Sequence, residues 1–160
     1  MTKIVDDFLD KKHFEELQEI VLGLDFPWYF QKSVNFNQED KDLYFYLTHL
    51  LFADNQPYSN FLPVFQPLLD KIGYNKLIRV KLNLYPRTEQ LRVNAPHVDF
   101  PFDNKGFLFY FNTCDSKTVL QDTYIDCVEN RGVYFDPTKP HSSSSCTNVK
   151  ARFSLNVNYI

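Results

Sequence analysis

Hydrophobic and polar residues follow two different periods along the chain, and the change between them lies near residue 76. Before it, apolar residues recur every three or four positions, which predicts helices with one buried face. The first predicted helix covers residues 10–23, with Asp10 as its N-cap and Gly23 as its stop. Its apolar face is formed by Phe14, Leu17, Ile20 and Val21.

Two more helices are predicted before residue 76. Residues 59–73 are expected to form a helix that is opened or bent at Pro63 and Pro67, because proline lacks a backbone donor and fixes φ. His13 and His49 lie in predicted helices, and we interpret both as ordinary surface or core histidines. Residues 38–52 repeat the helical period, with an apolar side made of Leu43, Tyr46, Leu47, Leu50 and Leu51.

From Lys76 onward, apolar residues alternate with polar ones or form short continuous runs, which predicts strands. Residues two apart in a strand point to the same face, so Arg152 and Ser154 share the face opposite to the apolar residues of the last strand. The serine run at 142–145 is predicted to be a solvated loop. The expected strands cover residues 76–86, 106–112, 118–121, 124–130, 131–136 and 148–160.

This order of elements predicts a mainly β chain with flanking helices, of the α+β class. A β-sandwich or jelly-roll barrel is expected, with the N-terminal helices packed on one outer face. We expect a single domain over residues 1–160, because the length suits one domain and no internal repeat is visible. Within it, residues 1–75 are expected to form a helical support region and residues 76–160 the jelly-roll core.

Composition narrows the classes of function. The hydrophobic fraction of 44% argues against disorder, and the aromatic fraction of 17% favours β-rich packing. The chain has four glycines and contains neither of the common glycine-rich phosphate-loop motifs, which argues against a nucleotide-driven enzyme. A net charge of −3 makes nucleic acid an unfavoured partner.

The cysteines and the lack of targeting signals favour a cytoplasmic setting. Cys114, Cys127 and Cys146 are odd in number and lack CxxC spacing, so we expect three free thiols in a reducing compartment. The N-terminal residues do not have the pattern of a signal peptide. No apolar run of about 18 residues occurs, so no membrane span is expected. The oligomeric state is left open.

The candidate chemistry begins in the stretch VNAPHVDFPF, residues 93–102. His97 and Asp99 lie two positions apart between two prolines, and alone they are explained equally well by a proline-flanked turn. His141 follows 44 residues after His97, and Arg152 lies 11 residues beyond it in the last predicted strand. The interpretation of the first pair therefore depends on the two downstream residues.

These four residue types suit one metal site with a bound acid. His97 and Asp99 share a face if their backbone is extended. Two imidazoles and one carboxylate on one face of an iron(II) ion leave three coordination positions open. An arginine near such a metal can bind the far end of a dicarboxylate through two parallel hydrogen bonds. The spacing therefore predicts a metal site made of His97, Asp99 and His141.

Together these residues resemble the iron(II)/2-oxoglutarate-dependent oxygenases, which have a double-stranded β-helix (jelly-roll, cupin-like) core, and within them the prolyl-4-hydroxylase-like branch. The resemblance covers roughly residues 76–160. The region between NLYP and HxD lacks the glycines of many members. The segment DSKTVLQD at 115–122 replaces the glycine-containing turn of many members and is closer to the shorter viral and bacterial relatives. Besides HxD, the resemblance is carried by NLYP at 83–86, LFYFN at 108–112, NRGVYFDPTKPH at 130–141 and RFSLNVNY at 152–159.

The resemblance implies a role for each candidate residue. The implied metal-binding and catalytic residues are His97, Asp99 and His141. The implied co-substrate-binding residues are Arg152, Tyr110, Tyr85 and Ser154. Of these, Arg152 would anchor the C5 carboxylate of 2-oxoglutarate, supported by Tyr110 and Ser154. The implied cofactors are iron(II), 2-oxoglutarate and dioxygen, with ascorbate as a candidate reductant.

The implied activity is hydroxylation of a C–H bond with release of succinate and CO2. The substrate is expected to be a peptidyl group, prolyl among them, or a small molecule. The alternative is a non-catalytic metal- or ligand-binding module on the same jelly-roll fold. Arg79, Arg87 and Arg92 are interpreted as solvated charges rather than substrate contacts.

Overall fold

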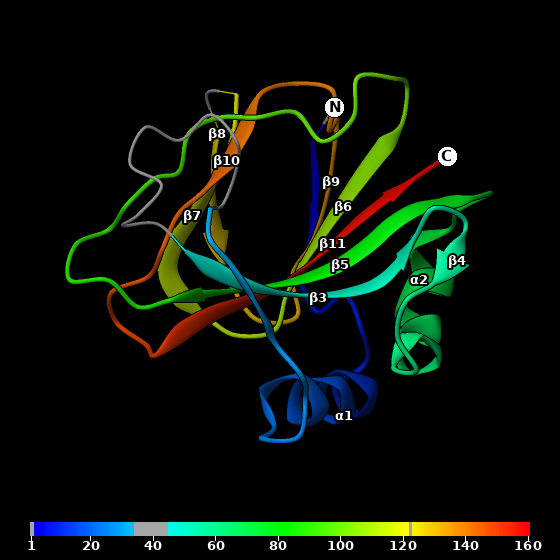
Figure 1. Cartoon of the computed structure of the whole chain (residues 1–160), viewed down its shortest axis with the longest axis horizontal. Coiled ribbons are helices and arrows are strands. Elements are labelled where there is room, and N and C mark those ends of the chain that lie inside the picture. Colours follow the sequence, from blue (N-terminus) through cyan, green and yellow to red (C-terminus); the bar gives the residue numbers. More distant parts are fainter. Residues whose placement is uncertain (1, 34–44, 122) are drawn as a thin grey trace.

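The computed structural model describes residues 2–33, 45–121 and 123–160. Two antiparallel β-sheets and two short helices make up this part of the chain (Figure 1). The large sheet has the order β1-β9-β6-β11-β5-β3-β2, with β4 paired to β3, and the small sheet has the order β10-β7-β8. The strands of the large sheet are β1 (Lys3–Val5), β2 (Tyr29–Gln31), β3 (Tyr46–Ala53), β4 (Gln56–Pro57), β5 (Leu77–Pro86), β6 (Lys105–Tyr110), β9 (Gly132–Phe135) and β11 (Ala151–Tyr159). Those of the small sheet are β7 (Cys114–Leu120), β8 (Thr123–Cys127) and β10 (His141–Ser143).

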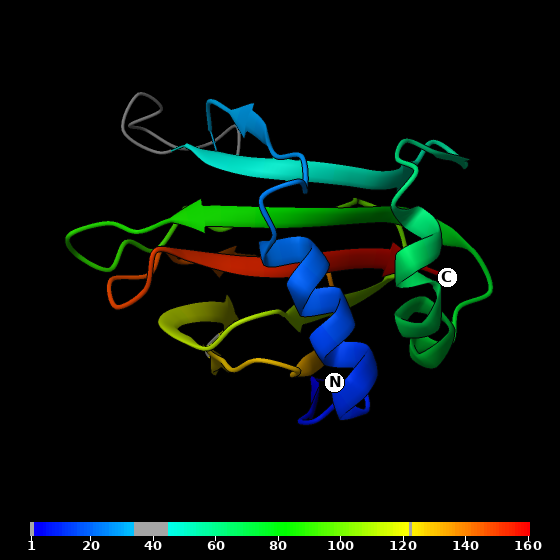
Figure 2. The ribbon, with the colours of Figure 1, turned by 90° about the horizontal axis from the view of Figure 1, so that it is seen from below.

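Both helices cover one face of the large sheet, as the sequence predicted (Figure 2). Helix α1 (Lys11–Leu22) begins where the Asp10 side chain accepts a hydrogen bond from the backbone N–H of His13, and it ends at Gly23. A 3₁₀ turn (Leu62–Phe65) leads into helix α2 (Gln66–Ile72), and each has a proline in its first turn. The buried residues that the helices add to this core are Phe14, Leu17, Val21, Leu68, Leu69 and Ile72.

The alternation of residues along the strands gives the large sheet two different faces. On β6, Phe107 and Phe109 pack in the helix-covered core, whereas Leu108 and Tyr110 pack against the small sheet. On β11, Leu155 lies in the helix-covered core. The polar residues between its apolar ones face the space between the two sheets, and that space holds the candidate site.

Two predictions of local structure are wrong. The part of the predicted helix 38–52 that the structure describes forms strand β3, which pairs with both β5 and β2; residues 38–44 lie outside the described residues. A run this rich in apolar residues fits both periods, so pairing with β5 decides its structure. The predicted serine loop is not solvated: strand β10 pairs with β7, and Ser142, Ser144 and Ser145 are buried.

Strand β3 has a consequence for the expected division of the chain. Strands β1 to β4 all precede residue 76 and belong to the large sheet, so the sheet extends across the boundary expected between a helical support and a jelly-roll core.

His49, in β3, is a core histidine that contacts the Pro27 carbonyl and the Ser59 hydroxyl. The single-domain organisation stays a prediction. Neither helix in the described ranges has the length and apolar character needed to traverse a bilayer.

The side chain of Asn130, in the turn between β8 and β9, is hydrogen-bonded to the segment before α1. Asn130 is buried with a φ of 56°, and its side chain exchanges two 2.8 Å hydrogen bonds with the backbone N–H and C=O of Leu9. We predict that Asn130→Ala lowers the free energy of unfolding by about 3 kcal/mol, because two buried backbone groups lose their partners and alanine disfavours positive φ. Urea denaturation measures this.

Asn55→Ala is the matched control. Asn55 also has a positive φ, of 60°, but it is exposed and its side chain makes no hydrogen bond to the described residues. Its replacement should cost about 1 kcal/mol from the backbone conformation alone. Equal losses for the two variants would contradict the role given to the Asn130 side chain.

Candidate metal centre

A β-bridge brings the two predicted histidines together. His97 lies in the connection from β5 to β6, and His141 is the first residue of β10. Each donates its backbone N–H to the other's carbonyl at 2.9 Å, which sets the two imidazole centroids 4.6 Å apart. Asp99 follows two residues after His97, and its backbone N–H donates to the Pro137 carbonyl at 3.1 Å. Backbone hydrogen bonds thus hold the connection at both residues of the HxD pair.

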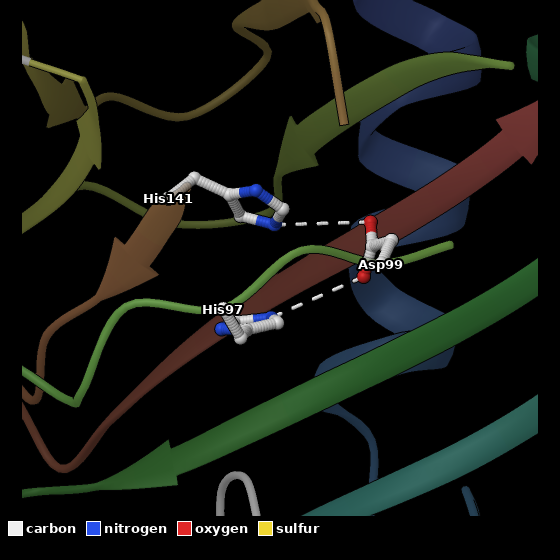
Figure 3. A group of neighbouring side chains, drawn as sticks. All are labelled: His97, Asp99 and His141. Atoms are coloured by element: carbon white, nitrogen blue, oxygen red, sulfur yellow. Dashed lines mark ion pairs between the residues drawn. The ribbon is translucent and has the colours of Figure 1, made fainter. Parts of the chain in front are cut away.

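The three side chains point toward one another (Figure 3). His97 Nε2 lies 3.9 Å from Asp99 Oδ1, and His141 Nε2 lies 3.8 Å from Asp99 Oδ2. One candidate ligand atom from each residue lies within 4.8 Å of the others. His141 Nδ1 lies 3.0 Å from the Lys139 carbonyl, so this nitrogen donates and Nε2 keeps its lone pair for a metal. Two imidazole nitrogens and one carboxylate suit a non-haem iron(II) ion.

The carboxylate of Asp99 is held in place by three other side chains. Arg79 Nη2 donates to Asp99 Oδ1 at 2.7 Å. The amides of Asn156 and Asn158, both on β11, donate to Oδ2 at 3.2 and 3.0 Å. Burial opposes ionisation of Asp99, but Arg79, His141 and the two amides outweigh it and hold its pKa at about 2. The carboxylate is therefore ionised, as a metal ligand must be.

His97 is kept neutral by its surroundings. Burial, followed by the proximity of His141, lowers the pKa of His97 to about 4, in spite of the nearby Asp99. A neutral imidazole is the form that binds a metal. The three residues therefore fit a divalent metal ion in their geometry, and His97 and Asp99 fit it in their protonation states as well.

Arg152 is a buried cation at the other end of the same pocket. It is 1% exposed, and no carboxylate among the described residues forms an ion pair with it. Its guanidinium donates to the carbonyls of Lys117 and Ser144 and, at 2.6 Å, to the hydroxyl of Thr118. Its Nε is buried without a hydrogen-bond partner in the part of the chain that the structure describes. An unpaired buried charge is costly, so the site is complementary to an anion.

Three of the four predicted co-substrate residues line the pocket, and the fourth, Tyr110, does not. Tyr85 and Ser154 line the pocket together with Arg152 and the three candidate metal ligands. Tyr110 is fully buried and does not line it; its ring lies 5.3 Å from the guanidinium of Arg152, and its hydroxyl is 2.8 Å from that of Thr118. Burial raises the pKa of Tyr110 to about 12, so the hydroxyl stays protonated. Thr118, which the sequence did not indicate, is the residue of this pair that lines the pocket.

Sequence reasoning also missed the residues that support Asp99. The interpretation of Arg79 as a solvated charge is wrong, because it pairs with Asp99 and its side chain is 21% exposed. A signal was present: four successive alternate positions of the predicted strand 76–86 carry polar or tyrosine side chains, and in a strand these share one face. Those positions are Arg79, Lys81, Asn83 and Tyr85.

The Arg79–Asp99 ion pair is expected to stabilise the folded protein. We expect Arg79→Met to lower the free energy of unfolding of the metal-free protein by about 3 kcal/mol, because the 3% exposed carboxylate of Asp99 loses its only arginine. Arg79→Met combined with Asp99→Asn should be closer to wild type, since the uncompensated charge is then gone. Chemical denaturation in the presence of a chelator measures both.

Lys117→Met is the comparison for an exposed ion pair. Lys117 pairs with Asp126, whose side chain is 62% exposed, so its loss should cost less than about 1 kcal/mol. An Arg79→Met variant as stable as Lys117→Met would show that Asp99 does not depend on Arg79.

No protein-family model and no curated protein matches the sequence. The structure is similar to a prolyl hydroxylase from Trichoplax adhaerens in complex with a peptide fragment of the hypoxia inducible factor oxygen degradation domain, with a TM-score of 0.70 and 14% identity over 99% of this chain and 83% of that one.

Two bacterial structures are similar to the same degree. A prolyl-4-hydroxylase from Pseudomonas putida has a TM-score of 0.67 and 13% identity, covering 99% of this chain and 91% of the other. An oxidoreductase of the 2OG-Fe(II) oxygenase family from Burkholderia pseudomallei has a TM-score of 0.69 and 12% identity, covering 99% and 84%. At these identities the likeness shows the fold, and it confirms the predicted double-stranded β-helix with helices packed on one face.

Proposed function

We propose that the protein is an iron(II)- and 2-oxoglutarate-dependent dioxygenase that hydroxylates a C–H bond and releases succinate and CO2. One observation carries the proposal: a pocket between the two sheets has a His-Asp-His cluster at one end and, at the other, a buried arginine without a carboxylate partner among the described residues. The cluster suits iron(II), and the arginine suits one end of a dicarboxylate. The likeness in fold to 2OG-Fe(II) oxygenases supports the same conclusion.

The protein contributes fixed positions and charges to this reaction. His97, Asp99 and His141 would hold the metal, and Lys81 and Tyr85 line the same pocket. Bound iron and 2-oxoglutarate supply the oxidising chemistry, in which one oxygen atom of dioxygen enters the new carboxylate of succinate and the other enters the substrate. Because Arg79 and the two β11 amides already hold Asp99, the carboxylate needs little rearrangement to bind the ion.

The far end of the pocket would hold the second carboxylate of 2-oxoglutarate. Arg152 provides the charge, and Ser154 and Thr118 provide hydroxyl groups beside it. Tyr110 would act on this carboxylate through Thr118, to which its hydroxyl is bonded. Stacking of Arg152 between the rings of Tyr85 and Tyr110, at 5.4 and 5.3 Å, keeps the guanidinium oriented before the ligand arrives.

The proposed substrate is a peptidyl group or a small molecule. The Trichoplax adhaerens hydroxylase binds a peptide, which supports the first class, and the net charge of −3 disfavours nucleic acid. The cytoplasm is proposed as the location, because all three cysteines are free thiols buried in the structure.

Two variants separate metal binding from co-substrate binding. We expect His97→Ala to abolish tight iron(II) or manganese(II) binding. We expect Arg152→Met to keep metal binding and to weaken 2-oxoglutarate binding by a hundredfold or more, because a charge-assisted contact is lost. Isothermal titration calorimetry with manganese(II), followed by 2-oxoglutarate, measures both, and succinate release under iron(II) reports turnover.

The stability of Arg152→Met is the accompanying control. Removing a buried cation that lacks a carboxylate partner should leave the ligand-free protein about as stable as wild type, or more so. Metal binding and succinate release that are unchanged in both His97→Ala and Asp99→Ala would refute the proposed function.

A further inference from the structure

The pocket face of β5 and β11 carries a ladder of polar side chains. The two strands are antiparallel, and their register sets four polar pairs opposite each other: Arg79 with Asn158, Lys81 with Asn156, Asn83 with Ser154, and Tyr85 with Arg152. One end of the ladder contacts Asp99 and the other contains Arg152. Lys81 therefore lies between the candidate metal ligands and the candidate carboxylate anchor, and it lines the same pocket.

Lys81 is the cation of this ladder that has no polar partner among the described residues. Arg79 is paired with Asp99, and Arg152 donates to two carbonyls and the Thr118 hydroxyl. The Lys81 ammonium lies over the Tyr46 ring, with Nζ 5.7 Å from its centroid. Burial, and then the charge of Arg79, lower the pKa of Lys81 to about 8, so at neutral pH it is still mainly a cation.

Two hydrogen-bond acceptors beside Lys81 also lack partners. Asn156 Oδ1 and Asn83 Oδ1 are buried without a hydrogen bond to the described residues. The amide nitrogen of Asn156 donates to Asp99, which fixes the orientation of this amide and leaves its oxygen as a free acceptor. 2-Oxoglutarate offers oxygen acceptors and no donors, so it satisfies neither oxygen. A ligand complementary to this region needs an anion for Lys81 and a donor for the asparagines.

We propose that Lys81 determines substrate specificity by binding a carboxylate of the substrate, and that the substrate is a free amino acid, whose amino group donates to Asn83 and Asn156. This inference rests on the proposed function, since it concerns the substrate of the same site. It favours the small-molecule class over a peptidyl group, because a residue within a peptide has neither a free α-carboxylate nor a free amino group.

A second source of the carboxylate is 2-oxoglutarate itself, through its C1 end. The proposal places Lys81 on the substrate, because Arg152 and the metal ligands already account for the two ends of 2-oxoglutarate. If Lys81 binds the substrate, Lys81→Met should lose substrate binding and keep 2-oxoglutarate binding. If Lys81 binds the C1 end of 2-oxoglutarate, the same variant should lose 2-oxoglutarate binding.

The test uses the protein saturated with manganese(II) and 2-oxoglutarate, so that binding is measured without turnover. The probes are the twenty protein amino acids as free acids and the same twenty as C-terminal amides, titrated by calorimetry. Lys81→Met is compared with Lys81→Arg, which keeps the charge, and with Lys105→Met. Lys105 is a matched control, because its Nζ also lies over a tyrosine ring, 6.0 Å from the centroid of Tyr159, but it does not line the pocket.

We expect one or a few free acids to bind wild type at least tenfold more tightly than their amides. Lys81→Met should weaken that binding by about tenfold to a hundredfold, Lys81→Arg should restore part of it, and Lys105→Met should not change it. With iron(II) and dioxygen, the same free acid should gain the mass of one oxygen atom in wild type. The affinity for 2-oxoglutarate should be equal in wild type and Lys81→Met.

Several results would overturn the inference while the proposed function stands. They are equal binding of acids and amides, no binding of any free acid to wild type, or a Lys81→Met variant whose only defect is weaker 2-oxoglutarate binding. Absence of 2-oxoglutarate binding and succinate release in wild type would overturn both.

Discussion

The burial of two opposite charges in one pocket is the constraint on which the rest of the site depends. The side chains of Asp99 and Arg152 are both almost inaccessible to water, and they are not paired with each other. The protein compensates Asp99 internally, with Arg79 and two asparagine amides. It compensates Arg152 only with carbonyls and a hydroxyl, which leaves an excess of positive charge that a carboxylate ligand would neutralise. The carboxylate of Asp99 is thus stabilised at one end of the site, and the other end is complementary to an anion.

The two-faced large sheet makes this arrangement compatible with a stable fold. Successive residues of β11 alternate between the helix-covered core, which Leu155 and Val157 help to form, and the pocket, which Ser154 and Asn156 line. The helices α1 and α2 bury the apolar face, so the other face is free to carry polar groups between the sheets. The small sheet then closes the pocket, and its strand β10 delivers His141 through the bridge to His97. Neither histidine would be placed correctly by local sequence alone.

The sequence correctly predicted the elements whose hydrophobic pattern fits a single type of secondary structure. The alternation in 148–160 placed Arg152 and Ser154 on the pocket face, and the spacing of HxD, His141 and Arg152 selected residues that the structure brings together. It failed at residues 46–52, where a nearly continuous apolar run fits both a helix and a strand and pairing with β5 decides. The serine run was misjudged because its hydroxyls bond to backbone groups of distant segments, such as Ser144 to Lys117 and Ser145 to Arg92. Arg79 was misjudged for the same reason, since its partner lies 20 residues away in a connection without regular structure.

In the proposed function, one pocket holds a metal and a dicarboxylate in fixed relative positions. The most direct measurement is a crystal structure of the protein with manganese(II) and 2-oxoglutarate. We predict a metal ion bound by His97, Asp99 and His141, with one carboxylate of 2-oxoglutarate on the guanidinium of Arg152. A metal bound elsewhere, or a dicarboxylate that does not contact Arg152, would contradict the account.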